Sequence, residues 1–415
     1  MKASLNLLSI RLVLSTLFMC VLALSSPARS QDHASHMTGP SKSKDHCQGS
    51  GLECANAATP FFDQDGKLFL AWTANGVVSV AQSQDLGKTF ASPVKIAEHS
   101  KSLDVGADAR PQILVDKLSN VFLAYAFFKD SNWNAQINTS RSTDGGKTFS
   151  TPESLIQDGS SQRFPSALIR SDGSIFMSWI DKRLVATAKQ GGEKRLGGSI
   201  AYSFSQDGGK TFQTERIANE SSCECCRIGV TLDLKVQPVI VYRAIFPGGI
   251  RDQASQVITA KAAEPIRRVA DDQWKTDACP HHGPTIAISE SGKFHVAWYT
   301  QGSKRSGVFY ANSTNQGVTY SQPTRVGKEG ASVSRPYLLA SGKQVWLVWK
   351  EFDGSDSSVY LKQSDDDGKS WSTPRVISKT NGYSDHPLLL SQGADVFLSW
   401  LTRNDGYQLI RIVDK

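Results

Sequence analysis

The chain lacks several features that would place it in common protein classes. After residue 30 no apolar run is long enough to cross a bilayer, so later membrane-spanning helices are excluded. No segment carries the repeating pattern of a long amphipathic helix, which argues against a helical fold. The 46 basic residues barely exceed the 39 acidic ones, and this balance does not indicate a nucleic-acid-binding surface.

The first 30 residues have the anatomy of a secretory signal peptide. Lys2 and Arg11 give a positive start, residues 12–24 are apolar, and Ala28-Arg29-Ser30 offers a small-residue cleavage site before Gln31. We therefore expect an exported protein, periplasmic or secreted, with no integral membrane segment after signal removal. Cleavage would remove three basic and no acidic residues and lower the formal net charge from +7 to +4.

Residues 31–53 predict a flexible polar leader, because they are rich in Gly, Ser, Lys and His. His33, His36, Met37 and His46 in this segment could ligate a metal, although a solvated tail is the simpler interpretation. Six of the seven cysteines remain after cleavage, and an even number outside the cytoplasm allows full pairing.

One octapeptide with the pattern Ser-x-Asp-x-Gly-x-Thr-aromatic returns five times. The copies are SQDLGKTF (83–90), STDGGKTF (142–149), SQDGGKTF (205–212), STNQGVTY (313–320) and SDDDGKSW (364–371). Similar segments that return along the chain predict a fold built from repeated structural units. The residue at the third position should accept hydrogen bonds from nearby backbone N–H groups in a tight turn, in which glycine can adopt a positive φ. In the five copies this residue is Asp85, Asp144, Asp207, Asn315 and Asp366. The aromatic residue should fill a gap between neighbouring sheets.

A second repeated feature is an apolar strand that recurs seven times at intervals of about 50–60 residues. The copies begin at residues 67, 120, 174, 238, 293, 344 and 395. Four antiparallel strands per unit, repeated radially, predict an all-β fold, a β-propeller formed by residues 54–415 as one domain. Seven blades with an incomplete last blade are favoured, and six remain an alternative.

The octapeptides resemble the Asp boxes of the sialidase superfamily, also called bacterial neuraminidase repeats, over nearly all of residues 55–413. This resemblance implies a propeller in which the octapeptides are structural turns on the face opposite the site. It also implies an arginine triad that holds a sugar carboxylate, a tyrosine nucleophile with a glutamate partner, and an aspartate acid/base. The Arg-Ile-Pro element usual before the first blade is missing, which leaves catalysis open.

Basic residues recur just before the strand expected to be innermost in every blade except the first, where Cys54 lies nearby. They are Arg110, Arg163, Arg227, His281, His282, Arg335 and His386. Because innermost strands surround the axis of a propeller, we expect these residues to surround a central mouth. The guanidinium groups could bind a carboxylate there, or could be rim residues and internal ion-pair partners. Catalytic candidates at the same mouth are Tyr383, Asp181 and Glu351, of which Asp181 is also explained by a surface ion pair with the adjacent basic residues.

Two chemistries fit the cysteines. They could form disulfides, with Cys47–Cys54, Cys223–Cys226 and Cys225–Cys279 as one possible pairing. The alternative is a copper or zinc site, because soft thiolates and imidazoles suit these ions. Its candidate ligands are Cys223, Cys225, Cys226, Cys279, His281 and His282.

These observations give one main functional hypothesis and two alternatives. The main one is an exported sialidase-like propeller that binds an anionic small molecule or glycan, with an acidic sugar as the favoured ligand, without a required cofactor. If the protein is an enzyme, the resemblance implies a glycoside hydrolase of the exo-α-sialidase type. The alternatives are a non-catalytic copper- or zinc-binding protein and a protein-interaction scaffold.

Overall fold

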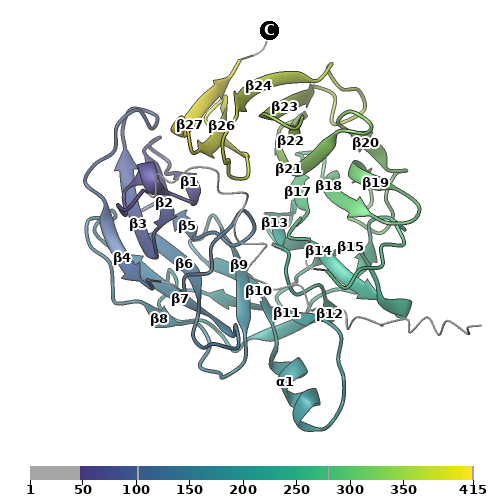
Figure 1. The fold of residues 1–415 in the computed structure, drawn as a ribbon, viewed down its shortest axis with the longest axis horizontal. Coiled ribbons are helices and arrows are strands. Elements are labelled where there is room, and N and C mark those ends of the chain that lie inside the picture. The colour runs from purple at the N-terminus through teal and green to yellow at the C-terminus, as the bar shows by residue number, and fades with distance from the viewer. Residues whose placement is uncertain (1–46, 101, 279, 414–415) are drawn as a thin grey trace, which may run out of the picture. The chain divides into compact units, whose positions relative to one another are not determined.

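The computed structural model describes residues 47–413 except 101 and 279, within a compact unit that spans Ser43–Lys415. The expected signal peptide, leader residues 31–46 and Cys279 lie outside the described residues. The described chain is almost entirely β-structure, as expected, and its sheets are arranged around a common centre (Figure 1). Among these residues no helix is long and apolar enough to cross a membrane.

The described strands form antiparallel sheets that follow one another along the chain. The first sheet contains Ala57–Phe62 (β1), Leu68–Ala74 (β2), Val77–Ser83 (β3) and Val94–Glu98 (β4). The second contains Gln112–Val115 (β5), Val121–Phe128 (β6), Ala135–Ser142 (β7) and Glu153–Ser154 (β8). Short 3-10 turns at Leu52–Cys54 (η2) and Pro247–Gly249 (η3) interrupt the β-structure.

The third sheet has eight strands and consists of two consecutive sets of four. The first set is Gln162–Ile169 (β9), Ile175–Asp181 (β10), Gly198–Ser205 (β11) and Arg216–Ser222 (β12). The second set is Gly229–Leu232 (β13), Pro238–Phe246 (β14), Ile250–Val257 (β15) and Arg267–Arg268 (β16). The two sets are joined by one pairing between β12 and β14, at Ser222 and Ala244.

Three more sheets complete the described chain. The next contains Thr285–Ile288 (β17), Phe294–Gln301 (β18), Ser306–Ser313 (β19) and Thr324–Val326 (β20). The following sheet contains Ser332–Ser341 (β21), Gln344–Phe352 (β22), Ser357–Ser364 (β23) and Arg375–Thr380 (β24). The last has three strands in the described part of the chain: Leu388–Gln392 (β25), Asp395–Thr402 (β26) and Gly406–Ile412 (β27).

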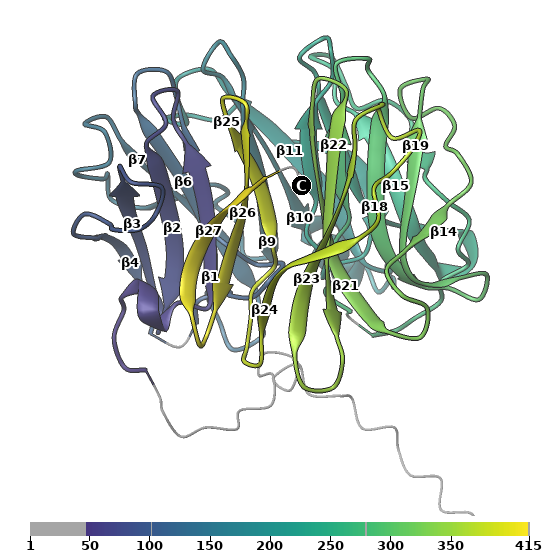
Figure 2. The ribbon, with the colours of Figure 1, turned by 90° about the horizontal axis from the view of Figure 1, so that it is seen from above.

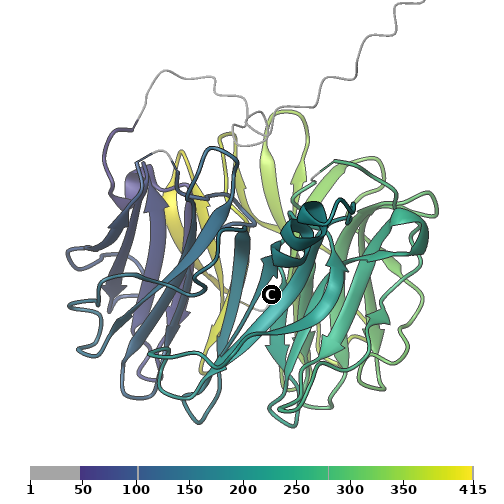
Figure 3. The ribbon, with the colours of Figure 1, turned by 90° about the horizontal axis from the view of Figure 1, so that it is seen from below.

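The first strand of each four-strand set faces the centre. Each of these strands contacts the first strand of the next set, from β1 through β5, β9, β13, β17 and β21 to β25, and β25 contacts β1. Aromatic side chains also join the two ends of the series, since the Phe62 and Phe397 rings lie 5.6 Å apart between β1 and β26. The strands run between two opposite faces of the unit (Figures 2 and 3). Connections on one of these faces therefore bring together residues from distant parts of the chain.

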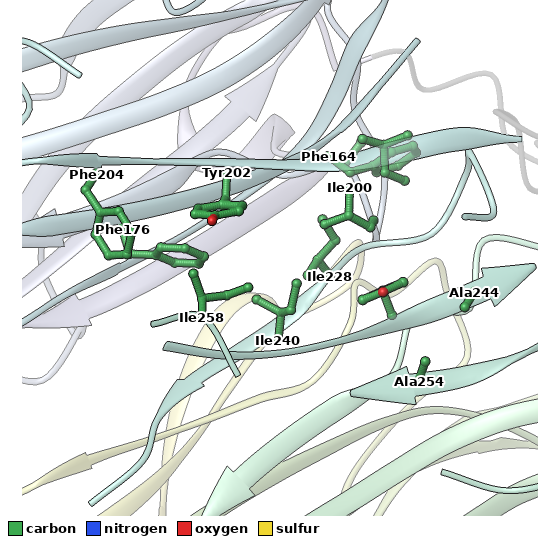
Figure 4. Packing of buried hydrophobic residues seen from close by; sticks show 13 residues of the cluster. Phe164, Phe176, Ile200, Tyr202, Phe204, Ile228, Ile240, Ala244, Ala254 and Ile258 are labelled. Carbon is green, nitrogen blue, oxygen red and sulfur yellow. The ribbon is translucent and has the colours of Figure 1, made fainter. Parts of the chain in front are cut away.

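Neighbouring sheets pack face to face through apolar side chains. Figure 4 shows such a cluster between the two sets of the eight-stranded sheet, where Phe176, Tyr202 and Phe204 meet Ile240 and Ile258. Because a sheet in this arrangement is covered on both faces, its central strands are buried along most of their length, as in β2 and β10. The one α-helix in the described residues, Arg183–Gln190 (α1), lies outside these layers and contacts β11 (Figure 1).

The five octapeptides share one hydrogen-bonding pattern, except that in the fourth copy Asn315 Nδ2 donates to the Thr319 hydroxyl. Each lies between the third and fourth strands of its set, directly after β3, β7, β11, β19 or β23. In the first copy the Ser83 hydroxyl accepts from Gly87 N–H at 2.8 Å, and Asp85 accepts from the N–H and hydroxyl of Thr89 at 2.9 and 2.6 Å. The sets β13–β16 and β25–β27 carry no copy, and the corresponding turn of the first of these lies between β15 and β16.

The aromatic residue that ends each octapeptide packs against the preceding sheet. Phe212 lies 5.8 Å from Phe122 and Trp371 lies 5.1 Å from Tyr310, between ring centroids. Phe90 of the first sheet has no preceding sheet in sequence and packs instead on Tyr407 of the last, at 5.9 Å. The turns therefore also hold adjacent sheets together.

Candidate functional site

Arg110 and Asp385 form a buried ion pair at the inner ends of the sheets. The Arg110 Nη2 lies 2.5 Å from Asp385 Oδ1, and both side chains are less than one tenth exposed. Arg110 Nη1 also donates to the Ala58 carbonyl, and Asp385 Oδ2 accepts from Ala58 N–H. The pair thus joins the segments before β5 and β25 to β1, so the predicted mouth residue Arg110 is fully engaged with protein groups.

Asp108 is the centre of a second group of contacts. Its Oδ1 lies 3.0 Å from Arg335 Nη1 and 3.5 Å from Arg227 Nε, and its Oδ2 accepts from Gly283 N–H at 3.2 Å. The Asp108 side chain is 1% exposed. One buried carboxylate therefore orients two guanidinium groups that arrive from β21 and from the segment before β13.

His386 lies among these arginines as a neutral imidazole. Burial lowers its pKa well below the ordinary value, and the charges of Arg227, Arg110 and Arg335 lower it further. Its Nε2 is 3.3 Å from the Pro336 carbonyl, which also accepts from Arg227 Nη2 at 3.2 Å. Its Nδ1 is buried and has no hydrogen-bond partner among the described residues.

A lysine adds further positive charge at the same place. Lys350 Nζ donates to the Ser384 carbonyl at 3.0 Å and hydroxyl at 2.6 Å. Burial, followed by the charge of Arg335, lowers the pKa of Lys350 to about 8. Burial lowers the pKa of Arg227 to about 10, so this guanidinium stays protonated at neutral pH.

We call these residues the axial cluster. Its members are Arg110, Arg227, Arg335, Lys350, His386, Asp108 and Asp385. Four cationic side chains face two carboxylates, and the histidine is neutral, so the cluster carries a surplus of positive charge. The structure thus brings together three predicted arginines and the predicted histidine from distant positions in the sequence.

The backbone near the cluster adopts a conformation that side chains rarely tolerate. Phe164, His281 and Arg335 have φ angles of +55°, +48° and +55°. All three lie near the start of the first strand of a set, in three different sets. Strained residues of this kind persist where the surrounding structure over-determines them, and they concentrate at functional sites.

Arg163, the fourth predicted arginine, belongs to a separate ion pair. Its Nε and Nη2 lie 2.7 and 2.8 Å from the two oxygens of the buried Asp104. The guanidinium also lies over the rings of Phe128 and Phe164, at 5.0 and 4.5 Å from their centroids. Two nitrogens of the Arg163 guanidinium thus bind the two oxygens of a protein carboxylate in a bidentate manner.

Two of the predicted catalytic carboxylates hold buried tryptophans. Asp181 Oδ2 accepts from Trp179 Nε1 at 3.0 Å, and Glu351 Oε1 accepts from Trp349 Nε1 at 2.8 Å. Both acids stand two residues after the tryptophan on the second strand of their sets. Asp181 is also paired with Arg183. A surface ion pair was expected here, but the Asp181 side chain is only 1% exposed.

Tyr383, the third catalytic candidate, lies at the edge of the axial cluster. It is 43% exposed, and its hydroxyl donates to the Asn56 carbonyl at 3.1 Å. Burial, followed by the charge of Asp385, raises the pKa of the Tyr383 hydroxyl to about 12. Neither Asp181 nor Glu351 has a contact with Tyr383 among the described residues, so no contact links the three candidates as a catalytic group.

The cysteines separate into a disulfide and a buried cluster. Cys47 and Cys54 form the expected disulfide. Cys223, Cys225 and Cys226, in the segment between β12 and β13, are all buried, with their sulfur atoms within 4.8 Å of one another. The considered Cys223–Cys226 disulfide is wrong: these sulfurs are 4.0 Å apart, about twice a bonded distance.

The two predicted histidine ligands do not belong to this three-sulfur cluster. The His281 ring lies 6.0 Å from the Phe164 ring, and its carbonyl accepts from Arg335 Nη1. The His282 ring packs on Tyr299 with 4.2 Å between centroids. Burial lowers the pKa values of both imidazoles, and the charge of Arg335 lowers them further.

Sequence reasoning missed the carboxylates and the lysine of the axial cluster. Asp108 stands two residues before Arg110, and Asp385 stands immediately before His386. An acid close to Arg110 and an acid next to His386 were therefore readable signals. Lys350 carries no such signal, because it follows the buried tryptophan of an ordinary strand.

A cavity of about 340 Å³ lies elsewhere, between the second sheet and the set β9–β12. Leu155, Ile156, Trp179, Phe212 and Glu215 are among its lining residues. None of the axial arginines lines it, so it is separate from the site described above.

Comparison with known proteins supports the fold. No protein-family model and no curated protein matches the chain. A solved ulvan lyase, a polysaccharide lyase, aligns with a TM-score of 0.54 and 10% identity over 88% of this chain and 93% of its own. A protein of unknown function from Dyadobacter fermentans aligns with a TM-score of 0.52 and 15% identity, over 76% and 95% of the two chains.

A Hadza microbial sialidase also aligns, with a TM-score of 0.49 and 12% identity over 83% of this chain and 76% of its own. Identities this low show the fold alone. The chain is therefore similar to β-propeller proteins, a fold on which glycan-processing enzymes are found, and the assignment to sialidases specifically stays a prediction.

Proposed function

We propose that this chain is an exported, seven-bladed β-propeller that binds an anionic glycan at the axial cluster. Seven blades follow when the eight-stranded sheet is counted as two blades. The observation that carries the function is the arrangement of Arg335. Only its Nη1 has hydrogen-bond partners among the described residues, Asp108 and the His281 carbonyl, and its side chain is 20% exposed. Its remaining N–H groups are available to a ligand.

Charge and preorganisation support an anion at this place. The cluster has four cationic groups against two carboxylates, and a buried surplus of positive charge favours a negatively charged ligand. Asp108 and the strained backbone hold Arg335 in place before binding, which reduces the entropy lost when the ligand binds. The unpartnered Nδ1 of His386 offers a further neutral polar group at the same cluster.

A sugar carboxylate is the ligand chemistry that fits best. Guanidinium groups bind carboxylates in a planar, bidentate manner. The ulvan lyase that shares this fold was solved with a glucuronic-acid-containing glycan. We therefore propose uronic acids and sialic acids as the candidate sugars. We propose binding without hydrolysis as the basic activity, because Asp181 and Glu351 are both engaged with tryptophans.

The test is calorimetric titration of the purified chain with acidic oligosaccharides and with their neutral, carboxyl-reduced analogues. We expect binding of at least one acidic glycan and none of its neutral analogue. Arg335→Gln should weaken binding by about 10-fold or more, since a charge-assisted hydrogen bond contributes roughly 1.5–3 kcal/mol. The control is Arg411→Gln, since Arg411 is 59% exposed and pairs with Asp395 away from the cluster.

Absence of binding across uronate- and sialate-containing glycans would overturn the proposal. Equal loss of affinity in the Arg335 and Arg411 variants would also contradict it, because it would place the ligand elsewhere. A fluorogenic sialoside or uronide, incubated with the same preparations, tests hydrolysis separately.

A further inference from the structure

An exposed tryptophan lies on a turn that the axial cluster does not use. Trp133 belongs to the turn between β6 and β7 and is 47% exposed. All nine tryptophans of the sequence lie within the described residues, and Trp133 is the one that is exposed. Tryptophan is enriched where proteins bind ligands and partners, because its large ring loses little conformational freedom on binding.

The turn imposes a backbone conformation on Trp133 that tryptophan does not favour. Its φ is +61°, and Asp130 Oδ1 fixes the turn by accepting from two of its backbone N–H groups at 2.9 and 3.1 Å. The same turn occurs at residues 63–67, where Asp63 is the acceptor and Gly66 occupies the position of Trp133 with φ +82°. Glycine meets the requirement for positive φ without strain, so the turn itself does not need a tryptophan ring.

Two contacts hold this turn beside the segments that lead to the axial cluster. At the end of β6, Phe128 N–H donates to the Ser102 carbonyl at 2.6 Å, and the chain continues from there to Asp108. Lys129 Nζ donates to the Ser160 carbonyl at 2.6 Å, just before β9. The turn therefore lies on the same face of the unit as the axial cluster.

A continuous row of side chains leads from the tryptophan to the axial cluster. Its ring is nearly perpendicular to that of Phe128, with 5.0 Å between centroids, and the Arg163 guanidinium lies 5.0 Å from the Phe128 centroid. Arg163 also contacts the Phe164 ring at 4.5 Å, and that ring lies 6.0 Å from the His281 ring. The His281 carbonyl accepts from Arg335 Nη1. A ligand that contacts both ends of this row must be extended.

We propose that Trp133 is a second sugar-binding position, on which one ring of an acidic oligosaccharide stacks while another unit of the same chain places its carboxylate on Arg335. This inference rests on the proposed function, because it extends that site outward. The apolar C–H face of a sugar can lie on the electron-rich face of an aromatic ring. The Asp130 turn holds the ring in place before binding, which reduces the entropy lost. The ligand class is therefore an oligosaccharide and not a single sugar.

The test compares acidic monosaccharides, galacturonic acid and sialic acid, with oligogalacturonides and sialyl oligosaccharides of increasing length. Calorimetric titration of the full chain should show affinity rising about 10-fold once the ligand spans both positions, on the scale of one aromatic contact. Trp133→Asn should abolish this gain and leave the monosaccharide affinity unchanged, whereas Trp133→Tyr should keep part of the gain. A bound oligosaccharide should also protect the exposed tryptophan from fluorescence quenching by acrylamide.

Folding is controlled separately from binding. Asparagine tolerates positive φ, so Trp133→Asn should unfold at the same temperature as the parent. Val236→Asn is the matched control, because Val236 is 42% exposed with φ +59° in the turn between β13 and β14, at the opposite end of the strands. This variant should leave every glycan affinity unchanged.

The same affinity for monosaccharides and oligosaccharides in the parent would overturn the second position and leave the axial site standing. So would an equal gain with length in the parent and in Trp133→Asn. Loss of monosaccharide affinity in a folded Trp133→Asn protein would contradict a separate position. Absence of binding for every acidic sugar would refute both the proposed function and this inference.

Discussion

Arg335 and Asp108 form an ion pair with 3.0 Å between Nη1 and Oδ1, although 227 residues separate them in the chain. The carboxylate is almost completely buried and also lies beside Arg227. A single acid from the segment before β5 thus fixes two arginines from other parts of the chain. The stability of the unit and the preorganisation of the proposed glycan site depend on the same contact.

Asp108→Asn should destabilise the protein strongly. The change removes the negative charge between two largely buried guanidinium groups, and breaking a buried pair costs about 3–5 kcal/mol. Urea denaturation measures the difference in free energy of unfolding. Asp395→Asn is the control: its pair with Arg411 is exposed and should contribute less than about 1 kcal/mol. Similar small losses in both variants would contradict the role given to Asp108.

Gly209→Ala and Gly208→Ala should differ although the residues are neighbours in one octapeptide. A Cβ on Gly209 would lie 2.3 Å from Phe122 Cδ2, whereas a Cβ on Gly208 meets nothing within 4 Å. Both have positive φ, and Leu86 occupies the position of Gly208 in the first copy with φ +58°. We expect Gly208→Ala to cost about 1 kcal/mol and Gly209→Ala about 1–3 kcal/mol more, measured by thermal unfolding. Equal costs would show that the aromatic contact does not constrain the turn.

Because of the octapeptide aspartates, the free energy of unfolding should fall in acid. The Thr89 hydroxyl and then its N–H lower the pKa of Asp85 to about 2 from an ordinary value near 3.8. The hydroxyls of Thr148 and Ser370 likewise lower the pKa values of Asp144 and Asp366. A lowered folded-state pKa stabilises the protein above the ordinary value, and this contribution is lost as the pH falls through about 2.

Asp144→Asn tests this pH dependence. The natural Asn315 keeps the same turn, with its Oδ1 accepting from Thr319 N–H at 2.9 Å, so the variant should fold normally at pH 7. Its free energy of unfolding should then decline less steeply than that of the parent between about pH 4 and pH 2. An unchanged slope would mean that Asp144 does not contribute to the acid sensitivity.

Glu351→Gln and Glu351→Ala separate a structural from a catalytic role. Glu351 Oε1 accepts from Trp349 Nε1 and from Lys328 N–H at 2.8 and 3.1 Å. Glutamine retains this acceptor oxygen and should cost less than about 1 kcal/mol, whereas alanine should cost about 1–3 kcal/mol. If any glycan hydrolysis is found, Glu351→Gln should retain it. Loss of hydrolysis in a folded Glu351→Gln protein would restore Glu351 as a catalytic candidate.

The repeated patterns predicted most of the fold. The octapeptides act locally, because Ser83, Asp85 and Thr89 bind one another within a few residues, so their spacing in the sequence was enough to predict a turn. Alternation of apolar strands and polar turns likewise predicted antiparallel sets of strands. The short helix at Arg183–Gln190 was not anticipated, because it is an excursion outside the repeat and packs on a single strand.

The site was only partly predictable. Basic residues before the later inner strands indicated Arg110, Arg227, Arg335 and His386, since the repeat gives equivalent positions. The carboxylates that pair with them, and the use of Asp181 and Glu351 by tryptophans, depend on side-chain directions that a strand pattern does not contain.

By itself the sequence determined the β-sheet sets, their turns, the Cys47–Cys54 pairing as a possibility and the recurrence of basic residues before the inner strands, because each of these depends on spacing along the chain. Only the tertiary structure decided that Asp108 lies between Arg227 and Arg335 and that Arg243 faces the three buried sulfurs. Contacts of this kind join residues from different sheets. Their distances follow from how neighbouring sheets pack and from where the first and last sheets meet.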